Sequence, residues 1–425
     1  MRGLLINLKP EIKILKIPPY ALLSLESMVR DKHDVKVLDC ALQKISTKKL
    51  LKKINPTFDF VGFSCLFRSG AIRILNLVKK IKKMYPNIYV IVGGEYASVN
   101  YEFILKGGVD FIIMGEGEET FLKLLDSLEK CYDITKVDGL SFIKDGKVVK
   151  TRTRDLLNMD CLPLVKCDLI EKSNHKFRFI ETSRGCNHTC KFCFVKKFWL
   201  YWRAKSVKRI VNEFIEAKKD LVDCLVILDN NFAGLKPERI RRLCIDIINQ
   251  KINIDWICTI RADFVTTFPE IINLMKKAGC VFVFIGFESM NDNILKEYSK
   301  NTTANTNLSA LKILRANKIL IEGAFILGYA NEKLMEMQKT IKFARKCDIW
   351  HLYVLGTYGT PLKRRKNLTI PRLLVGKEYI YLYIKNSLKL LFEKNYITHY
   401  LLSNQNGRMR TLISFWLKLR LKLLF

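Results

Sequence analysis

Short apolar segments alternate with longer amphipathic segments over the first third of the chain. Five apolar segments predict β-strands, at Gly3–Asn7, Val35–Asp39, Phe58–Ser64, Tyr89–Gly93 and Phe111–Gly115. The segments between them carry apolar residues every three or four positions, as over residues 71–84, which is the pattern of a helix packed on a sheet. Strands that alternate with helices in this way predict a doubly wound parallel sheet of the flavodoxin-like type.

A second series of strands and helices follows a change of pattern. Residues 139–149 predict a β-hairpin that turns at Asp145 and Gly146, and a linker runs on to residue 171. Six strands are then predicted, at Arg178–Arg184, Cys224–Asp229, Asp255–Ile260, Val281–Phe287, Ile321–Leu327 and Ile349–Leu355. Helical patterns separate them, at residues 207–219, 237–250, 268–278, 306–317 and 333–346. Six such units predict a partial (β/α)6 barrel, similar to a TIM barrel, with its site at the carboxyl ends of the strands.

These patterns divide the chain of 425 residues into four regions. We expect a Rossmann-like domain at residues 1–136, the hairpin and linker at 137–171, the barrel at 172–362 and a helical, basic C-terminal region at 363–425. A chain of this length is typical of two or three domains. No apolar run is long enough to predict a transmembrane helix.

Three cysteines stand at the carboxyl end of the first strand of the second series. Cys186, Cys190 and Cys193 have the spacing C-x3-C-x2-C. Three thiolates on one loop suit three irons of a 4Fe–4S cluster, which leaves the fourth iron open to a substrate or cofactor. A zinc knuckle is the alternative, but it would need a fourth ligand, and His188 is more typical of a solvated loop residue.

The cysteines also bear on the cellular compartment. The chain contains 13 of them, an odd number, and no secretory signal is present. Disulfide bonds are therefore not expected, and a reducing, cytoplasmic compartment is predicted.

Polar and glycine residues collect at the predicted strand ends. In the second series they are Asp229–Asn231, Thr259, Arg261, Glu288 and Ser289, and Gly328 with Glu332. In the first series the strand ends read Gly93-Gly94-Glu95 and Gly115-Glu116-Gly117. Because the carboxyl ends of parallel strands lie along one edge of a sheet, several such groups beside a cysteine loop predict a single site.

Basic residues outnumber acidic ones by 73 to 41, which gives a formal net charge of +32. This charge is compatible with nucleic-acid binding, with an anionic membrane surface or with solvated helix faces. The lysines are spread through every helical segment and form no compact stripe with aromatic residues outside the C-terminus, so no nucleic-acid partner is expected. Residues 408–425 alternate cations with apolar and aromatic residues, a pattern that suits peripheral contact with the inner face of a membrane or docking on the barrel.

Over about residues 1–361 the chain resembles the radical S-adenosylmethionine (SAM) enzymes that carry an N-terminal cobalamin-binding domain. The cysteine loop, with Phe192 before its third cysteine, is similar to the family signature. Further similar stretches are residues 18–25 (PPYALLSL), 92–94 (VGG), 115–118 (GEGE), 228–232 (LDNNF), 285–289 (IGFES), 323–328 (GAFILG) and 356–362 (GTYGTPL).

The resemblance implies the cofactors and a set of site residues. A 4Fe–4S cluster on the three cysteines would bind SAM at its open iron and cleave it to a 5′-deoxyadenosyl radical, which abstracts hydrogen from the substrate. The residues implied to contact SAM are Phe192, Asp229, Asn230, Arg261, Glu288, Gly323 and Gly328. Those implied to face cobalamin are Gly93, Gly94, Gly115 and Glu116. Arg261 suits a carboxylate because guanidinium pairs with it in a bidentate manner, and no residue is assigned a catalytic role.

One departure from the family pattern concerns cobalamin. Cobalamin domains commonly carry Asp-x-His-x-x-Gly, whose histidine binds cobalt, whereas the loop after the first strand reads KPEIKILKI over residues 9–17. Cobalamin is still expected, but its axial ligand is unassigned, and a domain that has kept the fold without the cofactor is the alternative.

The function that follows is radical SAM chemistry, with methylation of an unactivated carbon as the leading hypothesis. Cyclisation, ring contraction or oxidation on the same fold is the first alternative. A nucleic-acid or membrane-surface binding protein is the alternative from another class. The expected partners are a small-molecule or lipid-like substrate and an electron donor such as flavodoxin or ferredoxin.

Overall fold

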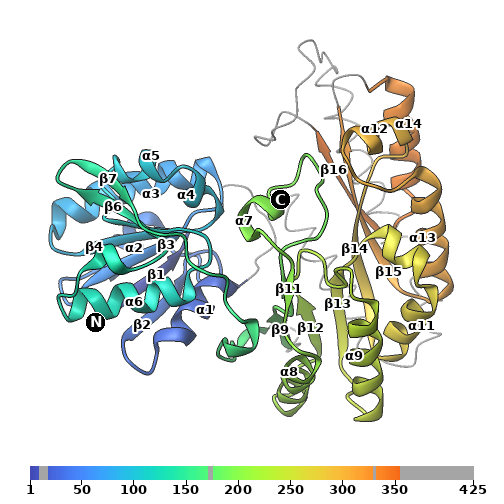
Figure 1. The fold of residues 1–425 in the computed structure, drawn as a ribbon, viewed down its shortest axis with the longest axis horizontal. Coiled ribbons are helices and arrows are strands. Elements are labelled where there is room, and N and C mark those ends of the chain that lie inside the picture. The colour runs from blue at the N-terminus through green and yellow to red at the C-terminus, as the bar shows by residue number, and fades with distance from the viewer. Residues whose placement is uncertain (9–17, 171–175, 329–331, 355–425) are drawn as a thin grey trace. The chain divides into compact units, whose positions relative to one another are not determined.

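The chain folds into two compact units. The structure is a computed structural model that describes residues 1–8, 18–170, 176–328 and 332–354. The first unit comprises Met1–Leu169, and the second begins at Ile170 (Figure 1).

The first unit is built on a seven-stranded sheet in the order β2-β1-β3-β4-β5-β6-β7. The strands are β1 (Arg2–Asn7), β2 (Asp34–Asp39), β3 (Phe60–Ser64), β4 (Tyr89–Gly93), β5 (Phe111–Ile113), β6 (Leu140–Lys144) and β7 (Lys147–Lys150). The first five pair in parallel, and the order 2-1-3-4-5 is that of flavodoxin-like folds. The predicted fold class of this region is therefore confirmed.

Helices cover both faces of this sheet. They are α1 (Tyr20–Val29), α2 (Thr47–Lys53), α3 (Arg68–Met84), α4 (Glu95–Val99), α5 (Tyr101–Leu105) and α6 (Glu118–Glu129). Successive residues of β1 point to opposite faces, so Leu4 and Ile6 pack in the core beside α3, while Leu5 packs in the core beside α1 and α6 (Figure 1). A strand buried on both faces explains the continuous apolar runs in the sequence.

The predicted hairpin is present, and it belongs to the sheet of the first unit. Asp145 and Gly146 both have positive φ, 51° and 73°, as a two-residue hairpin turn requires. β6 pairs antiparallel with β5, and β7 extends the sheet beyond it. The first unit thus runs to Leu169, whereas the sequence pattern placed its end at residue 136. The difference arises because hairpin strands without helices resemble a connection more than a continuation of the sheet.

The second unit is built on an open row of seven strands in the order β16-β15-β14-β13-β12-β9-β8. The strands are β8 (Cys167–Ile170), β9 (Lys176–Ile180), β12 (Cys224–Ile227), β13 (Asp255–Thr259), β14 (Cys280–Glu288), β15 (Leu320–Leu327) and β16 (Ile349–Val354). The six strands from β9 to β16 form a parallel series. The row is not closed within the described residues, so the predicted partial barrel is confirmed.

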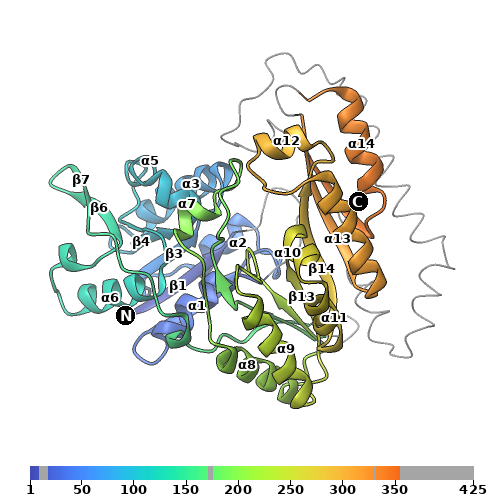
Figure 2. The same cartoon turned by 45° about the vertical axis from the view of Figure 1, so that its right-hand side comes forward.

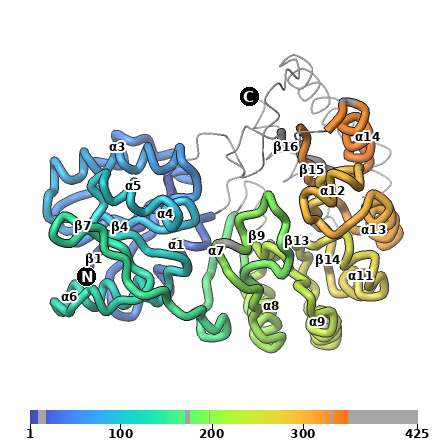
Figure 3. The backbone as a smooth tube through the Cα atoms, turned by 45° about the horizontal axis from the view of Figure 1, so that its top comes forward, coloured from blue at the N-terminus to red at the C-terminus, as the bar shows by residue number. Residues whose placement is uncertain are grey.

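Helices line one side of this curved row, as Figure 3 shows. They are α8 (Val207–Lys219), α9 (Pro237–Asn249), α11 (Pro269–Lys277), α13 (Ala304–Ala316) and α14 (Leu334–Ala344). Figure 2 shows these helices beside the strands. Their apolar faces and the strand residues that point toward them form one continuous core. Because the helices take up that side, the polar strand ends remain for the site.

Several short elements were not predicted. They are α7 (Val195–Trp199), β11 (Arg203–Ala204), α10 (Ala262–Thr267), α12 (Asp292–Glu297) and two 3-10 turns at residues 134–136 and 159–161. The strand predicted at Arg178–Arg184 is divided into β9, which ends at Ile180, and β10 (Ser183–Arg184). Segments of two to six residues are too short to display a period. The predicted C-terminal region at 363–425 and the turn at 356–362 lie outside the described residues. Among the described residues, no helix is both long and apolar enough to cross a membrane.

Gly94 offers a test of the first unit's packing. Its φ is +105°, and a Cβ there would lie 2.8 Å from the backbone oxygen of Cys65. We expect Gly94→Ala to lower the free energy of unfolding by about 1–3 kcal/mol, measured by urea unfolding followed by circular dichroism. Gly70→Ala in helix α3 is the control, because its Cβ would meet no atom within 4 Å. It should leave stability unchanged or raise it by up to about 1 kcal/mol. Equal midpoints for the two variants would contradict this account.

Candidate functional site

The cysteine loop leaves the carboxyl end of β9 and is closed at its base by a two-residue ribbon. Ser183 and Arg184 of β10 pair with β11 on the far side of the loop. Gly185 has φ +84°, and a Cβ there would lie 2.5 Å from the backbone oxygen of Tyr201. Within the loop, the three cysteines are half-buried. The predicted position of the triplet, at the strand end, is therefore correct.

A buried carboxylate holds the start of this loop. Asp229, after β12, accepts hydrogen bonds from the backbone N–H of Thr182 at 2.7 Å, its hydroxyl at 2.5 Å and the hydroxyl of Ser183 at 2.6 Å. Arg239 donates to the same threonine hydroxyl at 3.0 Å. Burial raises the pKa of Asp229, and the hydrogen bonds from Ser183 and Thr182 oppose that rise. The contacts of Asp229 are those of an anchor, although the sequence suggested SAM as its partner.

Two side chains direct N–H groups at the cysteine sulfurs. The Asn231 amide lies 3.7 Å from Cys186 Sγ, and Arg261 Nη1 lies 3.8 Å from Cys190 Sγ. Burial raises the pKa of Cys193, as do the charges of the other two thiolates. Three thiolates are thus costly to hold together unless metal or nearby cations balance them. Donors and cations around the sulfurs are the environment that an iron–sulfur cluster needs.

The spread of the sulfurs also favours a cluster. In the part of the chain that the structure describes, the one group of three potential ligand atoms that all lie within 4.8 Å is His33, Asp126 and Glu129 in the first unit. The loop sulfurs are therefore spread more widely than ligands around a single zinc ion, whose bonds are about 2.0–2.3 Å long. In a cluster each thiolate binds its own iron, so a wider spacing is required.

His188 lies within the loop and Arg261 lies beside it, and the two side chains differ in charge. Burial and the charge of Arg261 lower the pKa of His188 to about 4, so its ring is neutral at neutral pH. The Arg261 guanidinium itself is fully engaged. It pairs with both carboxylate oxygens of Asp263, at 2.9–3.1 Å, and donates to the backbone oxygen of Lys300 at 2.6 Å. These contacts join Arg261 to the loop and its neighbours, and the methionine carboxylate that the resemblance implies as its partner stays a prediction.

Glu288 ends β14 in a strained conformation. Its φ is +64°, and a β-bulge separates it from Gly286. Such a conformation costs of the order of 1–3 kcal/mol in a residue with a side chain. Its carboxylate pairs with Lys300 at 2.8 Å, and both side chains are buried. Strain and a buried ion pair at a strand end are both typical of functional sites.

Phe192 is held by the segment that follows α12. Its ring meets Tyr298 edge-on at a centroid distance of 5.4 Å, and it packs on the small cluster of Ile294, Tyr298 and Ile326. The Lys300 ammonium lies 5.9 Å from the ring centre. Phe192 is therefore anchored between the segment after α12 and Ile326 of β15, and its contact with the adenine of SAM stays a prediction.

The other residues of the second unit that the resemblance implies for SAM binding are Asn230, Gly323 and Gly328, and their surroundings differ. Asn230 is exposed at the rim, and Gly328 has φ +85° with its N–H bound to Glu332 at 2.6 Å. Gly323 has another explanation, because a Cβ there would lie 2.8 Å from both the Cys347 sulfur and the Phe325 ring. Those groups belong to the core beside the helices, so Gly323 makes room for packing on that side.

The cobalamin candidates lie at the strand ends of the first unit. Gly93 is the last residue of β4 and Gly94 follows it, where the backbone of Cys65 packs closely on Gly94. Gly115 follows β5 with φ +69°, and a Cβ there would meet no atom within 4 Å. Glu116 is buried and accepts the N–H of Leu157 at 3.1 Å. Gly115 thus offers open space to a ligand, whereas Gly94 and Glu116 serve the fold.

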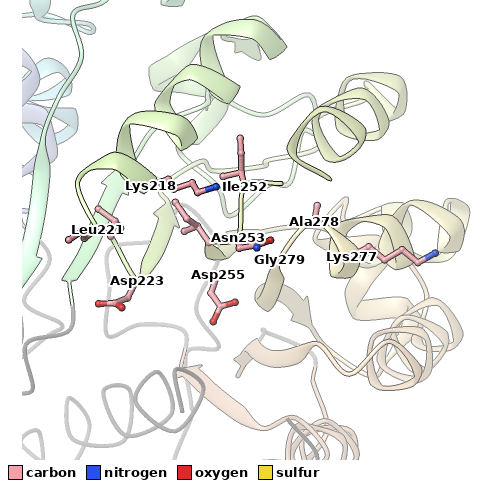
Figure 4. A pocket seen from close by; sticks show the side chains of 11 residues that line it. Lys218, Leu221, Asp223, Ile252, Asn253, Asp255, Lys277, Ala278 and Gly279 are labelled. Atoms are coloured by element: carbon pink, nitrogen blue, oxygen red, sulfur yellow. The ribbon is translucent and has the colours of Figure 1, made fainter. Parts of the chain in front are cut away.

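A separate hollow of about 810 Å³ lies at the opposite ends of the strands (Figure 4). Its lining includes Lys218, Asp223, Asn253, Asp255, Lys277 and Gly279. These residues precede or begin β12, β13 and β14, at the amino ends. In barrels this end serves stability, so the hollow is not the candidate site.

Sequence reasoning missed Thr182 and Lys300, and it placed Asn231 at the strand end without assigning it a contact. Asn231 stood beside two candidates, and only its burial shows that it, and not Asn230, points at a cysteine. Lys300 is one of many lysines in the chain, and no spacing distinguishes it. Its position after the short helix α12 could be seen only in the fold.

Comparison with known proteins agrees with this geometry. Residues 180–344 match the Radical SAM superfamily, and residues 15–125 match the B12 binding domain. An uncharacterized methyltransferase of Pyrococcus horikoshii is 32% identical over 358 residues, which cover 81% of this chain and 76% of the relative. An anaerobic magnesium-protoporphyrin IX monomethyl ester cyclase of Synechocystis is 25% identical over 370 residues, 82% of this chain and 74% of that enzyme.

A similar fold is found among solved structures. The cobalamin-dependent S-adenosylmethionine radical enzyme OxsB, with aqua-cobalamin and S-adenosylmethionine bound, superposes with a TM-score of 0.70 at 23% identity. The match covers 90% of this chain and 56% of the OxsB chain.

The chain belongs to the radical SAM superfamily, among those of its enzymes that also have a B12-binding domain. The cofactors of this group are a 4Fe–4S cluster, S-adenosylmethionine and cobalamin. The predicted enzyme class and the cofactors are therefore confirmed.

Asp229 provides a test of how the cysteine loop is anchored. In Asp229→Asn the charge that accepts three hydrogen bonds is lost, so we expect the free energy of unfolding to fall by about 1–3 kcal/mol. Iron retained per chain after anaerobic reconstitution should fall with it. Asn230→Ala, at the exposed neighbouring position, is the control and should keep both values. Normal iron content in Asp229→Asn would contradict the anchoring role.

Proposed function

We propose that this enzyme transfers a methyl group to an unactivated carbon of a small-molecule or lipid-like substrate. The observation that carries the proposal is the joining, in one chain, of a B12-binding unit to a radical SAM unit whose three-cysteine loop lies at the strand ends. When bound, the cluster and SAM supply a radical that activates the carbon, and cobalamin supplies the methyl group. The residues of the chain bind and orient the cofactors and the substrate.

In this proposal Cys186, Cys190 and Cys193 hold the cluster. Asn231 and Arg261 support the first two of these sulfurs through their N–H groups, at 3.7 and 3.8 Å. Asn230, exposed beside the loop, would turn toward the amino group of SAM. Glu288 would accept a hydrogen bond from a ribose hydroxyl at the end of β14, where Lys300 holds its carboxylate at 2.8 Å. Phe192 supports the adenine side.

The first unit would hold cobalamin over its strand ends. Gly115 leaves space beside β5, and Leu66 and Phe67 expose apolar side chains after β3. An apolar rim with open backbone suits the flat face of a corrin ring. The axial ligand stays unassigned, since residues 9–17 lie outside the described part of the chain.

A second candidate function is a radical cyclisation or oxidation without methyl transfer. The similarity to the Synechocystis cyclase favours it, at 25% identity. Its site would need the same cysteine loop and the same SAM contacts. The two functions differ in whether S-adenosylhomocysteine is formed.

The partners and location in this proposal follow from the chemistry and the sequence. A flavodoxin or ferredoxin would supply the electron, and the reducing cytoplasm would keep the cysteines reduced. The basic tail at 408–425 would lie at the inner membrane face if the substrate is lipid-like. No nucleic-acid partner is expected.

The cysteine triplet provides the first test. A variant with Cys186→Ala, Cys190→Ala and Cys193→Ala should retain no iron or sulfide after anaerobic reconstitution, because the other cysteines lie in other elements. It should also form no 5′-deoxyadenosine from SAM under dithionite, measured by mass spectrometry. Cys161→Ala, at an exposed position, is the control and should match the wild type. A cluster spectrum that survives the triple change would exclude this assignment.

A second test separates methyl transfer from the alternative. The wild-type enzyme with its cluster is incubated with dithionite and SAM that carries a deuterated methyl group, with or without added cobalamin. We expect S-adenosylhomocysteine to form only with cobalamin and 5′-deoxyadenosine to form in both cases. If 5′-deoxyadenosine forms and S-adenosylhomocysteine never does, the cyclisation or oxidation hypothesis replaces methyl transfer.

A further inference from the structure

Two opposite charges meet in the interior at the carboxyl end of β14. The Glu288 carboxylate and the Lys300 ammonium are 2.8 Å apart, and each residue is only 6% exposed. Burying two charges carries a desolvation cost that a salt bridge repays only in part. Such a pair is therefore weak evidence for a stabilising role and calls for another explanation.

The backbone is shaped around this pair. A β-bulge and a φ of +64° turn Glu288 out of the regular strand. A Cβ on Gly286 would lie 2.2 Å from Glu288 Oε1 and 3.1 Å from Lys300 Nζ, so a side chain there would displace the pair from its present position. The β-bulge, the positive φ of Glu288 and the glycine at position 286 thus all accommodate one ion pair.

The pair is connected to the cysteine loop through Lys300 and its neighbours. The Lys300 backbone oxygen accepts from Arg261 Nη2 at 2.6 Å, and Nη1 of the same guanidinium lies 3.8 Å from Cys190 Sγ. The Lys300 ammonium lies 5.9 Å from the centre of the Phe192 ring, next to Cys193. The backbone of Tyr298, two residues earlier, accepts the N–H of Lys191 at 3.0 Å.

The charge of Lys300 lies close to the loop. Its ammonium is 5.9 Å from the centre of the Phe192 ring, and Phe192 directly precedes Cys193. Other charges nearby are those of Arg261 and its partner Asp263, which balance one another. Reduction of the cluster adds one electron from the reductant and makes the site more negative by one unit. The free energy of that step depends on every uncompensated charge close by.

We propose that the Glu288–Lys300 pair sets the reduction potential of the cluster, with Lys300 as a positioning residue whose positive charge favours the reduced state and Glu288 as its counterweight. The proposal rests on the proposed function, because it requires the cysteine loop to hold the cluster. The proposal therefore predicts that removing the charge of Lys300 and removing the charge of Glu288 shift the reduction potential in opposite directions. Loss of the lysine charge makes reduction harder, whereas loss of the glutamate charge makes it easier.

The test is a potentiometric titration of the anaerobically reconstituted full-length chain, followed by the electron paramagnetic resonance signal of the reduced cluster. At a fixed potential, Lys300→Met should lower the ratio of reduced to oxidised cluster about tenfold, a shift of about 59 mV for one electron. Glu288→Gln should raise the ratio about tenfold. The double variant should lie within about threefold of the wild type, and Lys300→Arg should stay close to it.

Lys277→Met is the matched control. Lys277 is an exposed lysine of α11 and lines the hollow at the opposite ends of the strands, so the same change there should not move the potential. Shifts of Lys300→Met and Glu288→Gln in the same direction, or shifts no larger than that of Lys277→Met, would overturn the proposal. If Lys300→Met holds no cluster, Glu288→Gln decides, because it leaves the lysine in place.

Iron and sulfide analysis separates failure of this proposal from failure of the proposed function. A wild-type chain without iron and sulfide after reconstitution would refute the cluster itself. A wild-type chain with a cluster that Lys300→Met, Glu288→Gln and the double variant all lose would overturn only the present proposal, because the pair would then be holding the loop in place.

Discussion

The site of this enzyme depends on one buried carboxylate. Asp229 gathers the N–H and hydroxyl of Thr182 and the hydroxyl of Ser183, all within 2.7 Å, and so ties the end of β9 to the end of β12. The cysteine loop begins directly after these residues. A long loop with three thiolates would otherwise lose conformational entropy each time it closed around metal. Because Asp229 already fixes the start of the loop in the folded chain, less conformational entropy is left to lose when the loop binds metal.

Polar and charged groups of the second unit surround the cysteine sulfurs at increasing distances. Thiolates lie at the centre, N–H donors from Asn231 and Arg261 come next, and the ion pairs of Arg261 with Asp263 and of Lys300 with Glu288 lie outside them. Arg261 and Lys300 therefore each have a carboxylate of their own. Such pairing keeps the net charge of the region small while leaving individual charges close to the sulfurs, where they act most strongly.

The sequence predicted the class of both units because long strands and helices repeat a pattern that local chemistry imposes. The pattern predicted the parallel pairing of the strands and the hairpin turn at Asp145 and Gly146. It also predicted that the cysteines follow the first strand of the second series. The fine structure of the site was not predicted. Which of Asn230 and Asn231 faces a cysteine depends on the turn after β12, and Lys300 reaches the site by way of a six-residue helix, α12, that has no period to detect. The SAM contact of Gly323 stays a prediction, because a glycine can serve both helix packing and ligand access.

The bulge in β14 has a consequence for how such enzymes diverge. In a regular strand, side chains alternate between the two faces of the sheet. The face toward which a residue at the strand end points is therefore set by the register of the core residues before it. The extra residue between Gly286 and Glu288 breaks that link. Core packing up to Phe287 and the chemistry beyond it are thereby separable, and the strand end becomes a place where new substrates can be accommodated without redesigning the sheet.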